Sequence, residues 1–256
     1  MEQKQSRGGI PHGLGLIAVA VALAIALPLS ASIAINGVKD IKQTRDTIVV
    51  TGSARYPIAA DLANWTLRAS AQEQTPAAAI KALRAKVARI DAFFTNGGLP
   101  AEAITAPPIQ VAQVSTRVPT GRKKPAFERV VVWRVSQEFR IQTTEISTLV
   151  RLASQVGNLL AEGTDVSVSP IEYLSTKLAA AKFAALRLAV ADAQKRASTI
   201  AQGLHANLGP VQKTLLGVYQ ITPRNSTQVS DYGIYDTSSQ LKDVEAVVNV
   251  TFRIQH

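Results

Sequence analysis

The segment from Ser175 to His205 constrains the fold most. It has no proline and no glycine before Gly203, and alanine, the strongest helix former, dominates it. We expect one long helix over about 175–205, with the Ser175 hydroxyl as its N-cap. The helix should cover a sheet, and a coiled-coil seam is the alternative. The buried stripe, at alternating steps of three and four, is expected to be Phe183, Leu186, Val190, Ala193, Ala197, Ile200 and Leu204.

The N-terminal segment is long and apolar enough to cross a membrane. Residues 14–35 are nearly all Ala, Val, Leu and Ile, and a spanning helix needs about 20 apolar residues. Lys4 and Arg7 precede this segment, so residues 1–13 are expected to stay in the cytoplasm while the rest of the chain is exported. We therefore expect a single-pass anchor.

The alternative is a cleaved signal peptide. Its apolar core would be residues 14–27, with cleavage among the small residues near Ser32-Ile33-Ala34. In either case residues 36–46 form a polar tether and residues 47–256 form the folded domain outside the cytoplasm.

Charge and cysteine content limit the classes of partner and chemistry. The net charge of +10 invites an anionic partner, such as lipid head groups or another polyanion. Export argues against nucleic acid. With no cysteine, the chain can form neither a disulfide nor a thiol nucleophile.

Two shorter helices are expected before the long one. Thr75-Pro76 starts the first, which ends at Asn96-Gly97-Gly98; its apolar face is Ile80, Leu83, Val87, Ile90 and Phe94. Residues 143–145 start the second, which Gly157-Asn158 and Gly163 close; its apolar face is Ile146, Leu149, Leu152 and Val156.

Strands are expected wherever apolar residues alternate or form short runs. A turn is expected at Tyr56-Pro57 and a long mobile loop over 222–239. The expected strands are 47–51, 62–69, 109–118, 127–142, 166–171, 211–220 and 244–254. The sequence thus predicts an α+β fold, with mixed or antiparallel sheets packed against three helices.

Three stretches resemble one known family. They are Ile48-Val49-Val50-Thr51-Gly52 with Ala60–Trp65, then Ala189–Ala197 with Leu208–Val211, and finally the strand Val244–Ile254. In this order and spacing they are similar to the SIMPL domain family, and most like its membrane-anchored branch. The resemblance covers roughly residues 47–256. It implies an α+β fold, an exported or envelope location and no catalytic residues. Together with the apolar N-terminal segment, we expect the bacterial inner membrane, with the domain on the periplasmic side.

Two positions depart from the family pattern. His205 stands where the family usually ends its long helix with glycine, and histidine tolerates a left-handed backbone better than most residues. Gln240-Leu241 replaces a common Pro-Gly turn, which indicates a different final hairpin.

The sequence offers little for catalysis or metal binding. Of its three histidines, His12 and His256 lie near the chain ends and only His205 lies within the expected domain. Asp61 and Glu138 are isolated acids on expected strands. We therefore expect no catalytic residue, no cofactor and no metal site.

Two surfaces are candidates for contact with a partner. Arg117, Arg122, Lys123 and Lys124 cluster at a hairpin tip, where they form either a solvated turn or a contact to an anionic surface. Tyr232 and Tyr235 lie in the expected mobile loop, and tyrosine is common in binding surfaces.

The sequence thus favours a membrane-anchored, non-enzymatic domain that works by association with protein partners or with itself. One alternative is a module that binds anionic lipid or another polyanion through the basic tip. The other is an enzyme with an unrecognised carboxylate site.

Overall fold

The computed structural model describes residues 46–119 and 127–255. Within them the chain is α+β, as predicted, with the helices α2 (Pro76–Asn96), α3 (Ile146–Ala161) and α4 (Leu178–Gly203) and the short 3-10 helix η1 (Ala101–Ala103). The strands are β1 (Thr47–Ala59), β2 (Leu62–Glu73), β3 (Ile104–Thr105), β4 (Gln110–Pro119), β5 (Phe127–Thr143), β6 (Val166–Val168), β7 (Glu172–Leu174), β8 (Asn207–Leu216), β9 (Gln220–Pro223), β10 (Ile234–Tyr235) and β11 (Leu241–Gln255).

The chain divides into two compact units. One contains the described residues of 1–52, 193–215 and 249–256, and the other contains residues 53–192 and 216–248. The expected anchor at 14–35 and tether at 36–46 lie outside the described residues, apart from Asp46. Among the helices that the structure describes, none is both long enough and apolar enough to span a bilayer.

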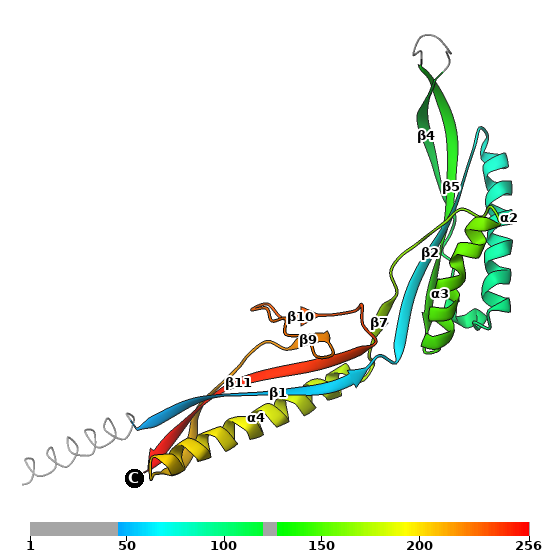
Figure 1. Cartoon of the computed structure of the whole chain (residues 1–256). Coiled ribbons are helices and arrows are strands. Elements are labelled where there is room, and N and C mark those ends of the chain that lie inside the picture. Colours follow the sequence, from blue (N-terminus) through cyan, green and yellow to red (C-terminus); the bar gives the residue numbers. More distant parts are fainter. Residues whose placement is uncertain (1–45, 120–126, 256) are drawn as a thin grey trace, which may run out of the picture. The chain divides into compact units, whose positions relative to one another are not determined.

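A six-stranded antiparallel sheet carries α2 and α3 (Figure 1). Its order is β3-β5-β2-β6, with β4 also paired to β5 and β7 to β2. The core is aromatic at its centre: the ring of Phe94 lies 6.3 Å from that of Trp65 and 6.4 Å from that of Phe139. Each large side chain buried there contributes roughly 1.5–3 kcal/mol.

The first helix follows the prediction closely. Thr75 is the N-cap, and its hydroxyl accepts a hydrogen bond from the Ala78 backbone N–H at 3.3 Å. Leu83, Ile90 and Phe94 are fully buried. A correct cap and a correct apolar face together place α2 on the sheet.

The second helix runs through the first of its two expected end signals. Gly157-Asn158 does not stop α3, which extends to Ala161 with Leu159 buried in the same core and ends just before Gly163. Burial of a leucine outweighs the cost of a mid-helix glycine, about 1 kcal/mol. Gly163, with φ of 76°, then turns the chain.

A five-stranded sheet carries the long helix. Its order is β1-β11-β9-β10, with β8 also paired to β11. The predicted turn at Tyr56-Pro57 is wrong, because β1 runs through it to Ala59. As β1 lies at the sheet edge, the missing proline N–H does not break the ladder.

The chain from 207 to 239 also differs from the prediction. The strand expected at 211–220 is two strands, β8 and β9, and the expected loop at 222–239 contains β10, which pairs in parallel with β9. A buried ion pair, described below, joins the residue that follows β10 to β11.

The start of α4 is not capped as predicted. The Ser175 hydroxyl has no hydrogen-bond partner. Instead, the Asp61 carboxylate accepts from the backbone N–H and the hydroxyl of Thr176, both at 2.7 Å. A carboxylate distant in sequence thus fixes the turn before the helix.

The buried face of α4 agrees with the prediction only in part, since Ala193 and Ala197 of the expected stripe are fully buried but its larger residues are not. Phe183 is 73% exposed, and Val190, Ile200 and Leu204 are exposed as well. The residues that are buried are all alanines, spaced by four: Ala181, Ala185, Ala189, Ala193, Ala197 and Ala201. Since alanine ends at Cβ, a helix with such a row can lie close to the sheet.

The end of α4 confirms the expectation for His205. Its φ is 54°, in the left-handed region. The Ala206 N–H donates to the Ala201 carbonyl at 2.9 Å, which is the bond pattern of a helix that ends in a left-handed residue. Histidine therefore occupies a position that favours glycine.

Candidate functional site

The basic hairpin tip is only partly within the described residues. Arg117 lies on β4, whereas Arg122, Lys123 and Lys124 lie outside them. The register of β4 with β5 places Arg117 opposite Arg129, an exposed residue. Like charges directly opposite on neighbouring strands are unfavourable unless something neutralises them. Arg129 was missed from the sequence, although counting across the hairpin would have found it.

The two tyrosines of the candidate partner loop are at the surface. Tyr232 is 97% exposed, and Tyr235, on β10, is 54% exposed. Their segment is not wholly a loop, contrary to the prediction, because it contains β10. Besides the β10–β9 pairing, the Gln220 side-chain amide donates to the Ser230 carbonyl at 2.6 Å.

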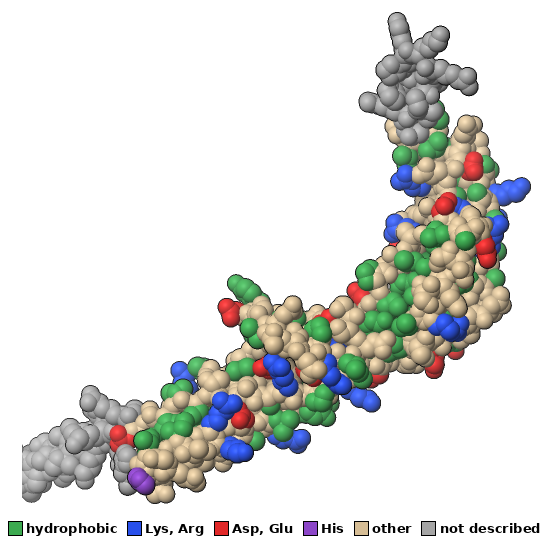
Figure 2. Space-filling model, viewed as in Figure 1, with side chains coloured by type: hydrophobic (Ala, Val, Ile, Leu, Met, Phe, Trp, Pro, Cys, Tyr) green, Lys and Arg blue, Asp and Glu red, His purple; other side chains and the backbone are tan. Residues whose placement is uncertain are grey.

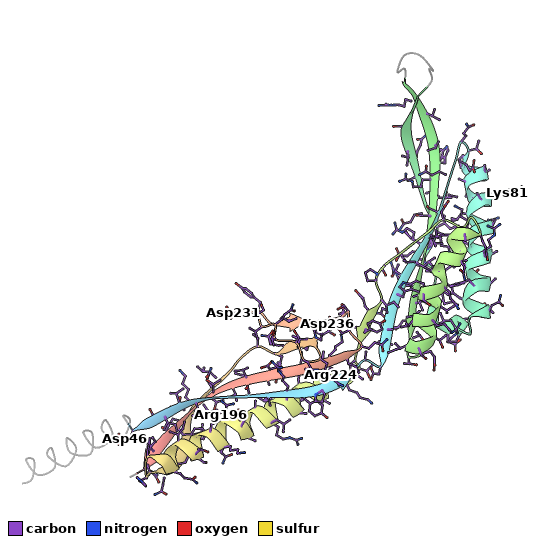
Figure 3. All side chains as sticks on the ribbon, viewed as in Figure 1. Asp46, Lys81, Arg196, Arg224, Asp231 and Asp236 are labelled. Atoms are coloured by element: carbon purple, nitrogen blue, oxygen red, sulfur yellow. The ribbon has the colours of Figure 1, made fainter. Side chains whose placement is uncertain are left out.

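A buried ion pair holds this segment to β11. The Lys242 ammonium lies 3.1 Å from the Asp236 carboxylate and donates to the Asp236 carbonyl at 2.6 Å. The two side chains are only 3% and 9% exposed. Figure 3 labels Asp236 beside the strands that it joins.

The carboxylate of this pair, Asp236, has a lowered pKa. Burial by itself would raise the pKa of Asp236, but hydrogen bonds from Ser238 and Lys242 outweigh it and lower the pKa to about 2. Asp236 is therefore ionised at neutral pH, and its negative charge stabilises the folded segment.

The two acids singled out from the sequence are held in structural contacts. Hydrogen bonds from Thr176 lower the pKa of Asp61. The Glu138 carboxylate accepts from Arg68 at 2.9 Å and from Arg140 at 2.6 Å, and these bonds lower its pKa. A general acid at neutral pH needs a raised pKa, so neither residue suits that role.

Metal-binding side chains do not gather in the described part of the chain. There, no group of three or more His, Cys, Asp or Glu side chains is placed to hold a metal ion. His12 and His256 lie outside the described residues, and His205 ends α4.

The exposed side of α4 carries a run of large apolar residues. Phe183, Leu186 and Val190 follow one another at steps of three and four, which places them on one strip of the helix surface. Phe183 and Val190 are 73% and 43% exposed, and Leu186 is half-buried. We call these three residues the α4 stripe. Figure 2 shows hydrophobic side chains at the surface over this helix.

A comparison with protein-family models identifies the fold. The model described as SIMPL, protein of unknown function (DUF541), matches residues 48–252, which extend from β1 to β11. The chain belongs to the SIMPL family. The resemblance seen in the sequence is thus confirmed for the SIMPL family as a whole. No curated protein matches the chain.

Membership explains the element order but assigns no activity, since the SIMPL family is described as one of unknown function. The long alanine-rich helix and the last strand, two of the stretches that carried the resemblance, are α4 and β11. In this SIMPL domain both elements contribute buried residues to the core, from Ala181 to Ala201 on α4 and from Val244 to Phe252 on β11.

Proposed function

We propose that this SIMPL-domain protein is anchored in a membrane by residues 14–35 and acts outside the cytoplasm by protein association. The partner is a second copy of the same chain, and the contact surface is the α4 stripe. The protein does not act as an enzyme in this proposal. Its function is to bring tethered copies together at the envelope.

The observation that carries this proposal is the exposure of Phe183. A phenylalanine that is 73% exposed on a well-formed helix leaves a large apolar area in water, next to Val190 and Leu186 on the same strip. Fully burying side chains of this kind contributes roughly 1.5–3 kcal/mol each.

A second copy of the chain is the simplest partner for the α4 stripe, for two reasons. A two-fold interface uses the same patch on both subunits, so an apolar stripe can cover its own counterpart. Copies anchored in one membrane also meet at an increased effective concentration, which favours even a small contact.

Sedimentation of the full chain in detergent micelles tests the proposal. We expect a concentration-dependent dimer that Phe183→Ser weakens at least about tenfold. Leu204→Ser is the matched control, because Leu204 is 58% exposed immediately after the end of α4 and lies outside the α4 stripe. A wild-type chain that stays monomeric, or equal effects of the two variants, would contradict self-association.

The anchor is tested separately by N-terminal sequencing of the mature protein from fractionated cells. An intact N-terminus in the membrane fraction supports the anchor. A chain that begins shortly after Ser32-Ile33-Ala34 would show that the N-terminal segment is a cleaved signal peptide.

A second candidate function is binding to an anionic surface through the basic tip. The observation that favours it is the register of Arg117 opposite Arg129, which adds a fifth cation to the four predicted ones. An anionic lipid or another polyanion would remove the repulsion between the paired arginines.

Vesicle co-sedimentation of residues 36–256 tests the second candidate. We expect binding to phosphatidylglycerol vesicles to be lost when Arg117, Arg122, Lys123 and Lys124 are changed to glutamine. Unchanged binding would exclude this surface. The control changes four exposed cations on other elements to glutamine: Lys81, Arg84, Lys195 and Lys213.

A further inference from the structure

A depression of about 420 Å³ lies on the five-stranded sheet, beside the segment that carries the two exposed tyrosines. Its apolar lining comes from Leu216, Val218, Val229 and Val247. Glu245 and Val247 alternate along β11 with the buried residues Val244, Ala246 and Val248. The depression therefore lies on the face of β11 opposite to that of its buried side chains.

The polar side chains of the depression are Gln220, Ser230, Asp231 and Glu245. Gln220 is 6% exposed; its amide N–H donates to the Ser230 carbonyl, and its Oε1 is buried without a partner. A buried acceptor without a partner costs about 1–3 kcal/mol, so a donor that reached Gln220 would recover this energy.

The charges that line the depression favour a ligand with a single positive charge. Glu245 is already paired with Arg55, whose Nε donates to Glu245 Oε2 at 3.0 Å. Asp231 is exposed at the rim and adds one negative charge (Figure 3). The site is thus net negative by one charge, on a chain whose net charge is +10.

We propose that this depression binds a lysine or arginine side chain of a partner polypeptide. The methylene stem packs on the four apolar residues, and the cationic head lies between the Asp231 carboxylate and Gln220 Oε1. Long basic side chains bury their stems on apolar surface in this way while the head meets polar groups. Charge-assisted hydrogen bonds to carboxylate and amide oxygen orient the head.

This site deepens the association function and rests on it for the polypeptide nature of the ligand. It is separate from the α4 stripe, because its residues come from β8, β9, β11 and the segment after β9. A partner that carries a basic side chain could therefore bind whether or not α4 pairs with a second copy.

The test is saturation-transfer NMR with the full chain in detergent micelles. The probes are N-acetyl-arginine amide and the citrulline analogue, which has the same shape without the charge. We expect saturable binding of the arginine probe and at least about tenfold weaker binding of the citrulline probe. Equal binding of both probes would overturn the proposal, as would binding of neither.

Variants locate the site. Asp231→Asn should weaken the binding of the arginine probe about tenfold, and Gln220→Met should weaken this binding by a similar factor. Glu102→Gln is the matched control, since Glu102 is an exposed acid on η1, and it should leave the binding unchanged. Equal effects of Asp231→Asn and Glu102→Gln would show non-specific attraction and overturn the site.

Two further outcomes are decisive. If a water molecule alone satisfies Gln220 Oε1, Gln220→Met will not change the binding, which would overturn the role of Gln220. Sedimentation of the same samples reports self-association separately. A monomeric chain that binds the arginine probe would refute pairing through α4 and support this site. A dimeric chain that does not bind the arginine probe would support pairing through α4 and refute this site.

Discussion

The ion pair between Asp236 and Lys242 should determine the stability of the segment from 222 to 239. Its atoms lie 3.1 Å apart, and the side chains are 9% and 3% exposed. Changing Asp236 to Asn keeps the shape but leaves the Lys242 ammonium buried without a counter-charge. Breaking a buried pair in this way costs about 3–5 kcal/mol.

The same pair gives a pH dependence whose direction is fixed. The pKa of Asp236 is about 2 in the folded chain, against an ordinary value of 3.8. Because the folded value is the lower one, the stabilisation is complete above pH 3.8 and is lost as the pH falls through 2. At about 1.4 kcal/mol per pKa unit, the full effect is about 2–3 kcal/mol, of which about 2 kcal/mol is lost between pH 5 and pH 2.

The assay has two parts. Hydrogen–deuterium exchange of peptides covering 222–239 at neutral pH gives the local opening free energy. We expect Asp236→Asn to lower it by about 3–5 kcal/mol, and the double variant with Lys242→Met to recover most of the loss. Urea unfolding near pH 5 and near pH 2 should show the difference between wild type and Asp236→Asn shrinking by about 2 kcal/mol.

Asp231→Asn is the control for these measurements, because Asp231 lies in the same segment but is exposed. A loss below about 1 kcal/mol for Asp236→Asn, or the same loss for both variants, would refute the reasoning. A difference from wild type that does not change with pH would refute the assigned pKa.

Three other substitutions test the structure through unfolding free energies. His205→Gly should stabilise by about 1 kcal/mol, because φ is 54° there; destabilisation would exclude a left-handed residue at this helix end. Gly97→Ala should cost about 1–3 kcal/mol, since the added methyl meets the buried Leu152 side chain, and a neutral result would contradict that packing. Ala189→Leu, on the fully buried row, should cost about 1–3 kcal/mol while the exposed Ala191→Leu stays near neutral; equal costs would show that another face is buried.

Local chemistry predicted much of the fold correctly. The Thr75 cap followed by proline and a regular apolar face fixed α2 almost to the residue. The last strand was equally clear, because alternate residues of β11 from Val244 to Phe252 are buried. In both places local preference and burial favour the same structure, and sequence patterns are then sufficient.

The buried face of α4 could not be predicted from hydrophobicity alone. Every choice of face on this helix contains alanine, and the larger residues suggest the wrong one. The sheet selects the small side chains at steps of four, from Ala181 to Ala201, because they allow close approach. Such selection depends on the shape of the partner surface, which is a tertiary property.

The candidate sites show the same limit. The polar composition of 222–239 indicated a loop without strands, whereas the segment contains β10 and is joined to β11 by the pairing of Asp236 with Lys242. The orphan Gln220 oxygen and the opposition of Arg117 and Arg129 depend on strand register. Residue types at fixed sequence spacing do not reveal either feature.

Photo-crosslinking at position 183 in native membranes tests the central claim most directly. Phe183 is replaced by p-benzoylphenylalanine in the full chain, and Leu204 is replaced in the same way as a control. Self-association through the α4 stripe predicts a light-dependent adduct of twice the chain mass from position 183 and little or none from position 204. No adduct at 183, or adducts only with other proteins, would contradict it.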